Sequence, residues 1–271
     1  HLPHSPILPT APYYNMYPAD EMVAPASIAD DMSNSPYRAK NGRLKLTQYT
    51  DPEQLKYMIS NYYGLITEVD VWVGKILDTL EENGLADNTL VIFTSDHGEM
   101  LGAHGMREKN VFYEESAHIP LLMRFPDGMK PKTQVDGYVS LVDLFATILD
   151  YMDVKEHASD GKSLRGLIEN TDQEQGKYVV TEWHWAGDKE PNYMVLNDGW
   201  KLMIPYSKSS KVINAMYNLN EDPHEMNNLL GNNPDRKKYQ AQAEQLRGNL
   251  LEWLKKNNSK HVKGVTEREL I

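Results

Sequence analysis

The stretch "DPEQLKYMISNYYGLITEVDVWVGKILDTLEENGLADNTLVIFTS", residues 51–95, decides the fold class, because a helical pattern in it leads directly into a strand pattern. Its first part, about thirty residues long, carries apolar side chains three or four positions apart, which predicts an amphipathic helix. Thr50 and Glu53 suggest a capping box at the start, and Gly84 suggests a left-handed cap at the end. The apolar run "TLVIFTS" is typical of a strand buried in a parallel sheet. A helix followed by such a strand predicts an α/β fold.

The α/β pattern continues downstream and then changes. Residues 119–126, "IPLLMRFP", predict a second strand, and residues 140–152, "SLVDLFATILDYM", predict a second amphipathic helix. After that come short alternating runs separated by turn residues, which favour antiparallel strands, and a leucine-rich helix within 233–258 with a charged tail expected to fray. We therefore expect an α/β domain over residues 1–170 and a smaller α+β subdomain over residues 171–271.

Composition excludes several classes of protein. The 271 residues are 40% hydrophobic and 25% charged, which is enough for a sizeable core, and the net charge of -11 argues against unspecific binding to nucleic acid or to anionic membranes. Cysteine is absent, which excludes disulfides, thiolate metal sites and an encoded cysteine nucleophile. No run approaches the roughly 20 apolar residues of a membrane span. An anionic ligand would therefore have to be held by local groups.

The run "SDHGEMLGAHGMREK", residues 95–109, follows the first predicted strand and carries the chemistry. Ligands of open α/β sheets bind at the carboxyl ends of strands, which is where Asp96 and His97 lie. Asp96 offers oxygen ligands for a hard cation, and His97 offers either a metal ligand or a donor to a bound anion. The glycines allow tight turns, and Lys109 supplies a positive charge. The alternative is a surface turn without a ligand.

The longer stretch "TSDHGEMLGAHGMREKNVFYEESAHIPLLMRFP" resembles the sulfatase family of the alkaline-phosphatase-like superfamily. Three later segments are similar to the same family: "VSLVDLFATILDYM", "DGKSLRGLIEN" and "MYNLNEDPHEMNNLLGNNPD". The resemblance covers approximately residues 1–10 and 51–255. It implies a mixed, mainly parallel sheet flanked by helices, a smaller C-terminal antiparallel sheet plus helix, and the hydrolysis of sulfate esters.

The resemblance also implies roles for particular residues. Asp96 and His97 match two metal-binding positions, and the implied metal is calcium, with magnesium or manganese as alternatives. Lys109 matches a lysine that contacts the sulfate group. The element "LPHSPI" puts His4 on a histidine that hydrogen-bonds the sulfate or the leaving oxygen, although a histidine in a proline-rich loop is the alternative. His104 is interpreted as part of the loop architecture rather than as a ligand.

The nucleophile that the family implies is missing. Sulfatases use a formylglycine made from the Cys or Ser of a Cys/Ser-x-Pro-x-Arg motif, and this chain has no such motif. The nearest approach, "NSPYR", holds Pro36 and Arg38 at the right spacing but has Asn34 at the nucleophile position. The acids Asp30 and Asp31 lack a preceding buried strand, and we interpret both matches as coincidences. The chain is thus expected to be a C-terminal portion, inactive alone, whose partner is the missing N-terminal segment of the same enzyme.

Two other functions stay open from the sequence: a phosphonate or phosphate diester hydrolase, and a non-catalytic sugar-binding or scaffolding module of the same fold. The expected substrate is a sulfate ester, and a sulfated glycan is one candidate. Trp183, Trp185 and Trp200 could stack on a sugar ring, with packing of the small sheet as the alternative. The family resemblance alone suggests a periplasmic or secreted protein.

Overall fold

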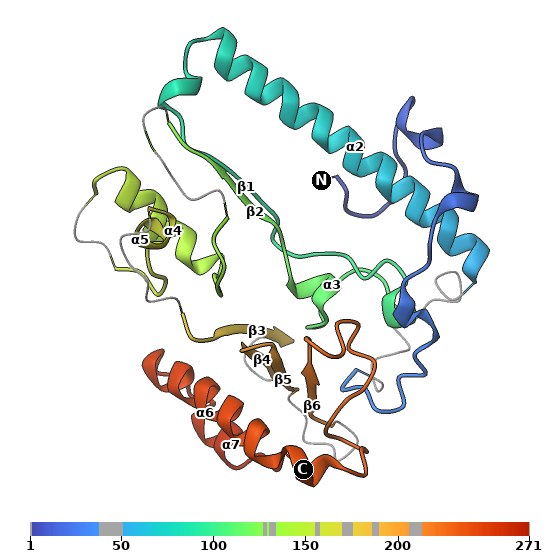
Figure 1. Ribbon diagram of the computed structural model, residues 1–271, viewed down its shortest axis with the longest axis vertical. Helices are drawn as coiled ribbons and strands as arrows, with labels where there is room; N and C mark the ends of the chain where they lie inside the picture. Colours follow the sequence, from blue (N-terminus) through green and yellow to red (C-terminus); the bar gives the residue numbers. More distant parts are fainter. Residues whose placement is uncertain are drawn as a thin grey trace. The chain divides into compact units, whose positions relative to one another are not determined.

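The computed structural model describes residues 2–37, 51–126, 129, 134–154, 158–169, 176–185, 190–205 and 213–270 (Figure 1). The chain divides into two compact units. Unit 1 comprises His1–Asp31 and Lys40–Met129, and unit 2 comprises Met32–Ala39 and Lys130–Ile271. The short segment Met32–Ala39 therefore belongs with the C-terminal unit. The predicted boundary between residues 170 and 171 lies within unit 2 and stays a prediction.

The long helix of unit 1, α2 (Pro52–Glu82), has 31 residues, as the periodicity predicts. The Asp51 carboxylate accepts two N–H groups of its first turn, at 3.0 and 3.5 Å, and so satisfies donors that have no partner within the helix. The cap is therefore Asp51, next to Pro52, rather than Thr50, which lies outside the described residues. Gly84 has a φ of 65°, which confirms the left-handed cap at the other end.

The N-terminal segment packs along the first half of α2 (Figure 1). It contains three short 3-10 helices: η1 (Tyr13–Asn15), η2 (Ala19–Glu21) and η3 (Ala26–Ala29). The Glu68 carboxylate accepts the N–H and the hydroxyl of Thr10 at 3.3 and 3.0 Å. A Cβ at residue 64 would lie 2.6 Å from the Tyr13 carbonyl oxygen, so Gly64 permits this close approach. These contacts tie the segment that follows His4 to the helix.

The apolar stripe of α2 is buried only in part. Leu55, Ile59 and Leu65 are buried in the first half of the helix. Further along, the exposed fractions are 55% for Trp72 and 61% for Ile76. The predicted amphipathic helix is thus confirmed, but in the structure its second half keeps apolar side chains exposed. Among the helices in the described part of the chain, none has both the length and the apolar character needed to span a bilayer.

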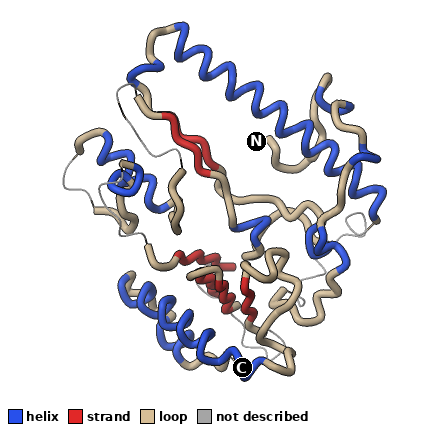
Figure 2. Tube along the Cα trace, in the orientation of Figure 1, coloured by secondary structure: helices blue, strands red, loops and turns tan. Residues whose placement is uncertain are grey.

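The two strands of unit 1 form a small sheet (Figure 2). Strand β1 (Val91–Thr94) pairs antiparallel with β2 (Leu121–Arg124), so the prediction of a parallel buried strand is wrong for this pair. The connection between them holds only helical turns of three and four residues, and no long helix that could carry the chain back for a parallel pairing. Phe93 is 39% exposed and Leu122 is 64% exposed, so the pair is not covered on both faces.

Unit 2 is built on an antiparallel sheet, as predicted. Strands β3 (Val179–Trp185), β4 (Glu190–Asn197), β5 (Trp200–Ile204) and β6 (Ala215–Asn218) follow one another in the order β3-β4-β5-β6. Helices α6 (Gln240–Lys256) and α7 (Val262–Thr266) lie along one face of the sheet (Figure 1). The sheet and α6 share a buried core that includes Val195, Leu202, Met216, Leu246, Leu250 and Leu254. The mixed α/β class with a smaller C-terminal antiparallel sheet and helix is confirmed.

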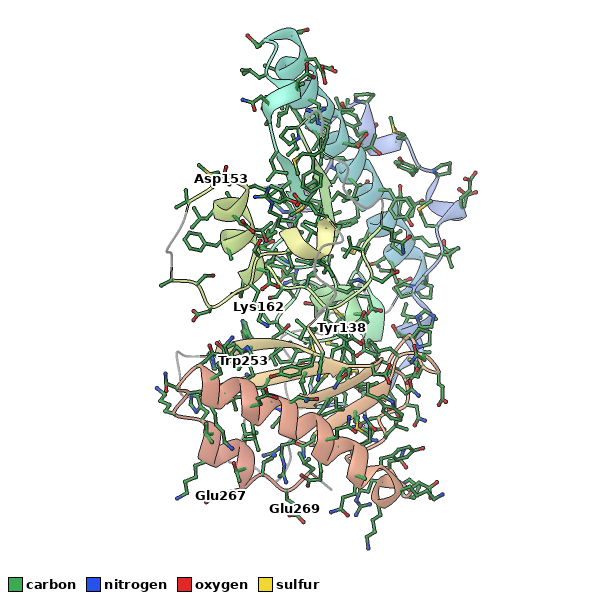
Figure 3. All side chains as sticks on the ribbon, turned by 60° about the vertical axis from the view of Figure 1, so that its left-hand side comes forward. Tyr138, Asp153, Lys162, Trp253, Glu267 and Glu269 are labelled. Carbon is green, nitrogen blue, oxygen red and sulfur yellow. The ribbon has the colours of Figure 1, made fainter. Side chains whose placement is uncertain are left out.

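The C-terminal tail is docked rather than frayed. Val265 of α7 and Leu270 beyond it are 4% and 5% exposed and belong to the core of unit 2. Glu267 and Glu269 lie beside helices α6 and α7 (Figure 3). The prediction of fraying is wrong because two widely spaced apolar side chains anchor a segment whose other residues are mostly polar or charged.

Helix α4 (Val142–Tyr151) and the short helix α5 (Arg165–Ile168) also belong to unit 2, as does the 3-10 helix η8 (Arg236–Tyr239). The Asp143 carboxylate accepts the N–H groups of Ser140 and Lys162, each at 2.9 Å. A Cβ at residue 161 would lie 2.1 Å from the Val142 carbonyl oxygen, so Gly161 is required for this approach. The segments "VSLVDL" and "DGKSL" are thus two sides of one packing contact.

Candidate active site

The candidate site begins where β1 ends. The N–H of Gly98 donates to the Ser116 carbonyl oxygen at 2.9 Å. A Cβ at residue 98 would lie 2.0 Å from the Glu115 carbonyl oxygen, which leaves no space for a larger residue. The backbone after β1 therefore runs directly against the segment around residue 115, and this contact sets where Asp96 and His97 lie.

Asp96 and His97 are adjacent and accessible, with side chains 84% and 31% exposed. The ring atom Nδ1 of His97 lies 2.8 Å from the Gly98 carbonyl oxygen, which suits an Nδ1–H donor and leaves a lone pair on Nε2. This Nε2 lies 3.6 Å from Oδ2 of Asp96, too far for a hydrogen bond. A lone pair on nitrogen and a carboxylate oxygen thus lie side by side, as two ligands of one cation would.

The donor set fits part of a metal centre. Carboxylate oxygen suits calcium, magnesium or manganese, and neutral imidazole suits transition metals. Within the described ranges, no cluster of three or more His, Cys, Asp or Glu side chains is placed to hold a metal ion. Asp96 and His97 could therefore supply two ligands, and the others would have to come from outside the described residues.

His4 and Lys109 lie together although 105 positions separate them in the chain. The Lys109 ammonium donates to Nε2 of His4 over 2.6 Å, while Nδ1 of His4 lies 2.9 Å from the Ser5 carbonyl oxygen. The ammonium has three donors and this contact uses one, so two can serve an anion. In the part of the chain that the structure describes, no hydrogen bond or ion pair joins this pair to Asp96 and His97.

A closed loop separates His97 from Lys109. The N–H of Met100 donates to the Glu108 carbonyl oxygen at 2.9 Å. One carboxylate oxygen of Glu99 accepts the N–H of Leu101 at 3.1 Å and also the N–H of Glu108. Sequence reasoning did not single out Glu99, although an acid directly after "SDHG" was a visible signal. Its carboxylate also lies near Tyr62, whose pKa is raised by burial and secondly by this negative charge.

His104 holds the tip of the same loop. Its side chain is fully buried, Nδ1 lies 2.7 Å from Oδ2 of Asp30, and the ring stacks on Tyr113 with centroids 3.9 Å apart. The backbone N–H of His104 donates to the Ser27 hydroxyl at 3.2 Å. This geometry agrees with the interpretation of His104 as loop architecture. It also gives the Asp30 carboxylate a partner within unit 1.

Asn34 has a structural place in unit 2. Its side-chain amide donates to the carbonyl oxygens of Asn228 and Leu230 at 3.2 and 3.3 Å. Its Oδ1 accepts the N–H of Asn232 at 2.6 Å. These bonds explain Asn34 without a reaction and agree with the reading of "NSPYR" as a coincidence. Arg38 lies outside the described residues.

The tryptophans divide between packing and undescribed positions. Trp200 packs against the core of unit 2, with its ring 6.5 Å from that of Tyr239, which favours the packing interpretation for this residue. The side chain of Trp185 is outside the described part of the chain. Trp183 stays a candidate for contact with a sugar.

A strand that ends in an Asp-His pair, together with a histidine–lysine pair suited to an anion, is the arrangement that the resemblance to the alkaline-phosphatase-like superfamily implies. The sulfatase family model matches residues 3–154, and a model described as "N-sulphoglucosamine sulphohydrolase, C-terminal" matches residues 102–256. The chain therefore belongs to the sulfatase family, and the resemblance found in the sequence is confirmed.

Arylsulfatases are among the proteins that are similar to this chain in sequence. Arylsulfatase K of Homo sapiens is 33% identical over 185 residues, which are 65% of this chain and 34% of that protein. An arylsulfatase of Clostridium perfringens is 28% identical over 268 residues, which are 97% of this chain and 53% of that protein. The chain thus spans between about a third and a half of the length of these relatives.

Solved structures give the same fold. A protein in complex with its substrate D-glucosamine-2-N,6-O-disulfate has a TM-score of 0.69 and 28% identity, over 85% of this chain and 46% of that one. The phosphonate monoester hydrolase of Agrobacterium radiobacter has a TM-score of 0.79 and 25% identity, over 94% of this chain and 55% of that one. Both similarities extend over most of the present sequence.

Proposed function

We propose that the chain supplies one half of the active site of a sulfuric ester hydrolase. His4 and Lys109 bind the sulfate group, and Asp96 and His97 bind a divalent cation, with calcium first and magnesium or manganese as alternatives. The observation that carries the proposal is the 2.6 Å contact between Lys109 and His4, two residues that are 105 positions apart in the sequence. A bound cation would supply electrostatic stabilisation of the sulfate oxygens.

Local charge favours an anion at this site although the whole chain carries a net charge of -11. A neutral His4 that accepts from Lys109 orients the ammonium, so its other N–H groups are held ready for sulfate oxygens. Donors that are already oriented need little reorganisation when an anion binds, and hydrogen bonds between charged partners are among the stronger ones. His4 thus orients the Lys109 ammonium, and the ammonium attracts the sulfate group.

The nucleophile and the remaining metal ligands belong, in this proposal, to a further N-terminal segment of the same enzyme. The sequence contains no cysteine and no Ser-x-Pro-x-Arg motif, so a formylglycine cannot form in it. The relatives extend well beyond the matched region, and the second half of α2 exposes apolar side chains that such a segment would cover. Alone, the chain binds sulfate but does not hydrolyse sulfate esters.

Two assays on the purified chain test this function. We expect no multiple-turnover hydrolysis of an aryl sulfate during titration with calcium, magnesium or manganese, and clear turnover would contradict the assignment of the nucleophile to another segment. Calorimetric titration with inorganic sulfate should show binding that Lys109→Met weakens by roughly tenfold. Lys56→Met, at a partly exposed lysine of α2, is the matched control. Equal affinity in the two variants would remove Lys109 from the site.

The substrate class in this proposal is a sulfated glycan. Support comes from the structural relative that was solved with D-glucosamine-2-N,6-O-disulfate. A glycan substrate outside the cell would suit a periplasmic or secreted enzyme, and cell fractionation tests that location. Competition of glucosamine 6-sulfate against methyl sulfate for the purified chain would reveal whether the sugar adds affinity.

A second candidate function is the hydrolysis of phosphonate or phosphate esters. The similarity to a phosphonate monoester hydrolase over 94% of this chain favours keeping it. Titration with methylphosphonate and with inorganic sulfate separates the two candidates, because a sulfate site should bind the sulfate ion more tightly. A reversed preference would favour the second candidate. A non-catalytic binding module is favoured if the complete protein lacks the Cys/Ser motif.

A further inference from the structure

We propose that Glu99 is a positioning residue that holds the two ends of loop 100–108 together and thereby sets the direction of Lys109. We call the place where these two ends meet the neck of the loop. One carboxylate oxygen of Glu99 receives two backbone N–H groups, those of Leu101 and Glu108, one on each side of the neck. The second donor belongs to the residue directly before Lys109. A single side chain thus joins the segment that follows His97 to the segment that carries the lysine.

The backbone around Lys109 depends on such a clamp. Glu108 and Asn110, on either side of the lysine, have φ angles of 61° and 78°. Side-chain-bearing residues adopt this left-handed region at a cost and keep it only where surrounding contacts enforce it. The bond from Glu108 to Glu99 is one such contact, and the backbone bond from Met100 to Glu108 at 2.9 Å is another.

The tip of the loop is held by contacts of its own, which do not involve Glu99. His104 at the tip is bound to Asp30 and Ser27, and a Cβ at residue 102 would lie 2.7 Å from the Leu55 side chain. These contacts anchor the middle of the loop but not its exit. The exit, where Lys109 turns toward His4, is held by Glu99 and by the backbone bond from Met100 to Glu108. Loss of the carboxylate should therefore loosen Lys109 and leave the tip in place.

The importance of Lys109 for sulfate rests on the proposed function, whereas the neck itself can be tested without it. The full purified chain is treated with sulfo-NHS-acetate, and the rate at which Lys109 becomes acetylated is measured by mass spectrometry. Lys56 and Lys75 serve as internal references. Hydrogen exchange of the peptide around Glu108 is measured on the same samples. Inorganic sulfate is added in a parallel series.

Three substitutions at residue 99 separate the contributions. Glu99→Gln keeps an oxygen acceptor of the same length without its charge, and should stay closer to the wild type than the other two variants. Glu99→Asp can still accept from Leu101 but is one methylene too short for Glu108, and Glu99→Ala accepts from neither. In both of these variants we expect the Glu108 amide to exchange roughly tenfold faster, as for a lost hydrogen bond to a charged group, with faster acetylation of Lys109.

Glu108→Ala is the matched control, because it removes a carboxylate beside Lys109 and keeps the backbone donor. It should leave the exchange rate unchanged. The proposal is overturned if Glu99→Asp, folded by circular dichroism, shows wild-type exchange and acetylation, or if Glu99→Gln is as loose as Glu99→Ala. Failure of sulfate to protect Lys109 in the wild type would count against the proposed function and leave the neck result intact.

Discussion

At Gly98 the backbone after β1 passes within contact distance of the segment that carries Glu115. One added side-chain atom at this position would be enough to disturb the site. The distance of 2.0 Å from a Cβ at residue 98 to a carbonyl oxygen cannot be relieved by turning a side chain, because the obstacle is backbone. Movement there would displace Asp96 and His97 as well. The residue next to the proposed ligands thus sets their position through size rather than chemistry.

Gly98→Ala should destabilise the chain by about 1–3 kcal/mol, since the added methyl group forces a backbone shift. Gly74→Ala is the matched control: nothing lies within 4 Å of a Cβ at this helical position. That change should stabilise by about 0.5–1 kcal/mol through the higher helix propensity of alanine. Urea unfolding followed by circular dichroism measures both, and equal midpoints for the two variants would contradict the close approach.

A second effect at the residue scale concerns Lys201 and Glu225, whose side chains are 0% and 1% exposed with Nζ and Oε1 2.9 Å apart. Glu225→Gln should cost about 3–5 kcal/mol, because it removes the carboxylate that faces a buried lysine charge. Lys238→Met removes an exposed partner of Asp235 and should cost less than about 1 kcal/mol. Denaturant unfolding compares the variants, and a cost for Glu225→Gln as small as that control would refute the buried pair.

The residues of the site differ in how far the sequence could reveal them. Asp96 and His97 could be placed at a strand end because the strand and the two residues are consecutive. The contact between His104 and Asp30 spans 74 positions, and periodicity carries no information about which distant side chains meet. Glu99 was missed for a related reason: its task is visible only once the donors at both sides of the neck are brought together.

At the scale of elements, helices were more predictable than strand partners. The length of α2 follows from local spacing, and its caps follow from residues within a turn of each end. The direction of β2 relative to β1 depends on how the 26 residues between them fold, which the sequence of neither strand records. Helix α4 shows another tertiary effect, since its last residue, Tyr151, acquires its surroundings from α5.

The pKa of Tyr151 is raised to about 12 by burial first and by Glu169 next, while Arg165 opposes the rise. The folded state therefore disfavours the phenolate. The unfolded chain loses this proton near its ordinary value of 10.0, so the stabilising contribution is complete below pH 10 and is lost as the pH rises toward 12.

Tyr151→Phe should therefore flatten the fall in unfolding free energy above pH 10, because phenylalanine has no proton to lose. Urea unfolding at a series of alkaline pH values measures this slope. Tyr57→Phe, at a ring that is 65% exposed on α2, is the matched control. If the slope for Tyr151→Phe equals that of the wild type, the packing of α5 on Tyr151 does not influence its ionisation.

At the scale of the whole molecule, the distribution of apolar surface is the feature that local elements do not explain. Unit 2 has a core that joins its sheet to α6, whereas in unit 1 the buried cluster around Leu55 and Ile59 lies at the beginning of α2. Ile66 and Ile76, further along the helix, are 45% and 61% exposed. A two-stranded sheet is marginally stable alone, so β1 and β2 also call for further packing partners.

Exposed apolar side chains on one element favour association with another surface. We therefore expect the purified chain to bind a hydrophobic dye and to self-associate in sedimentation velocity experiments. The double variant Ile66→Lys with Ile76→Lys should reduce both signals at little cost in stability, because both side chains are already exposed. Leu65→Lys, at a fully buried neighbour, should instead unfold the helix. If the double variant bound dye and sedimented like the wild type, the exposed apolar side chains around Ile66 and Ile76 would not form an interface, and the further segment proposed above would have to dock elsewhere.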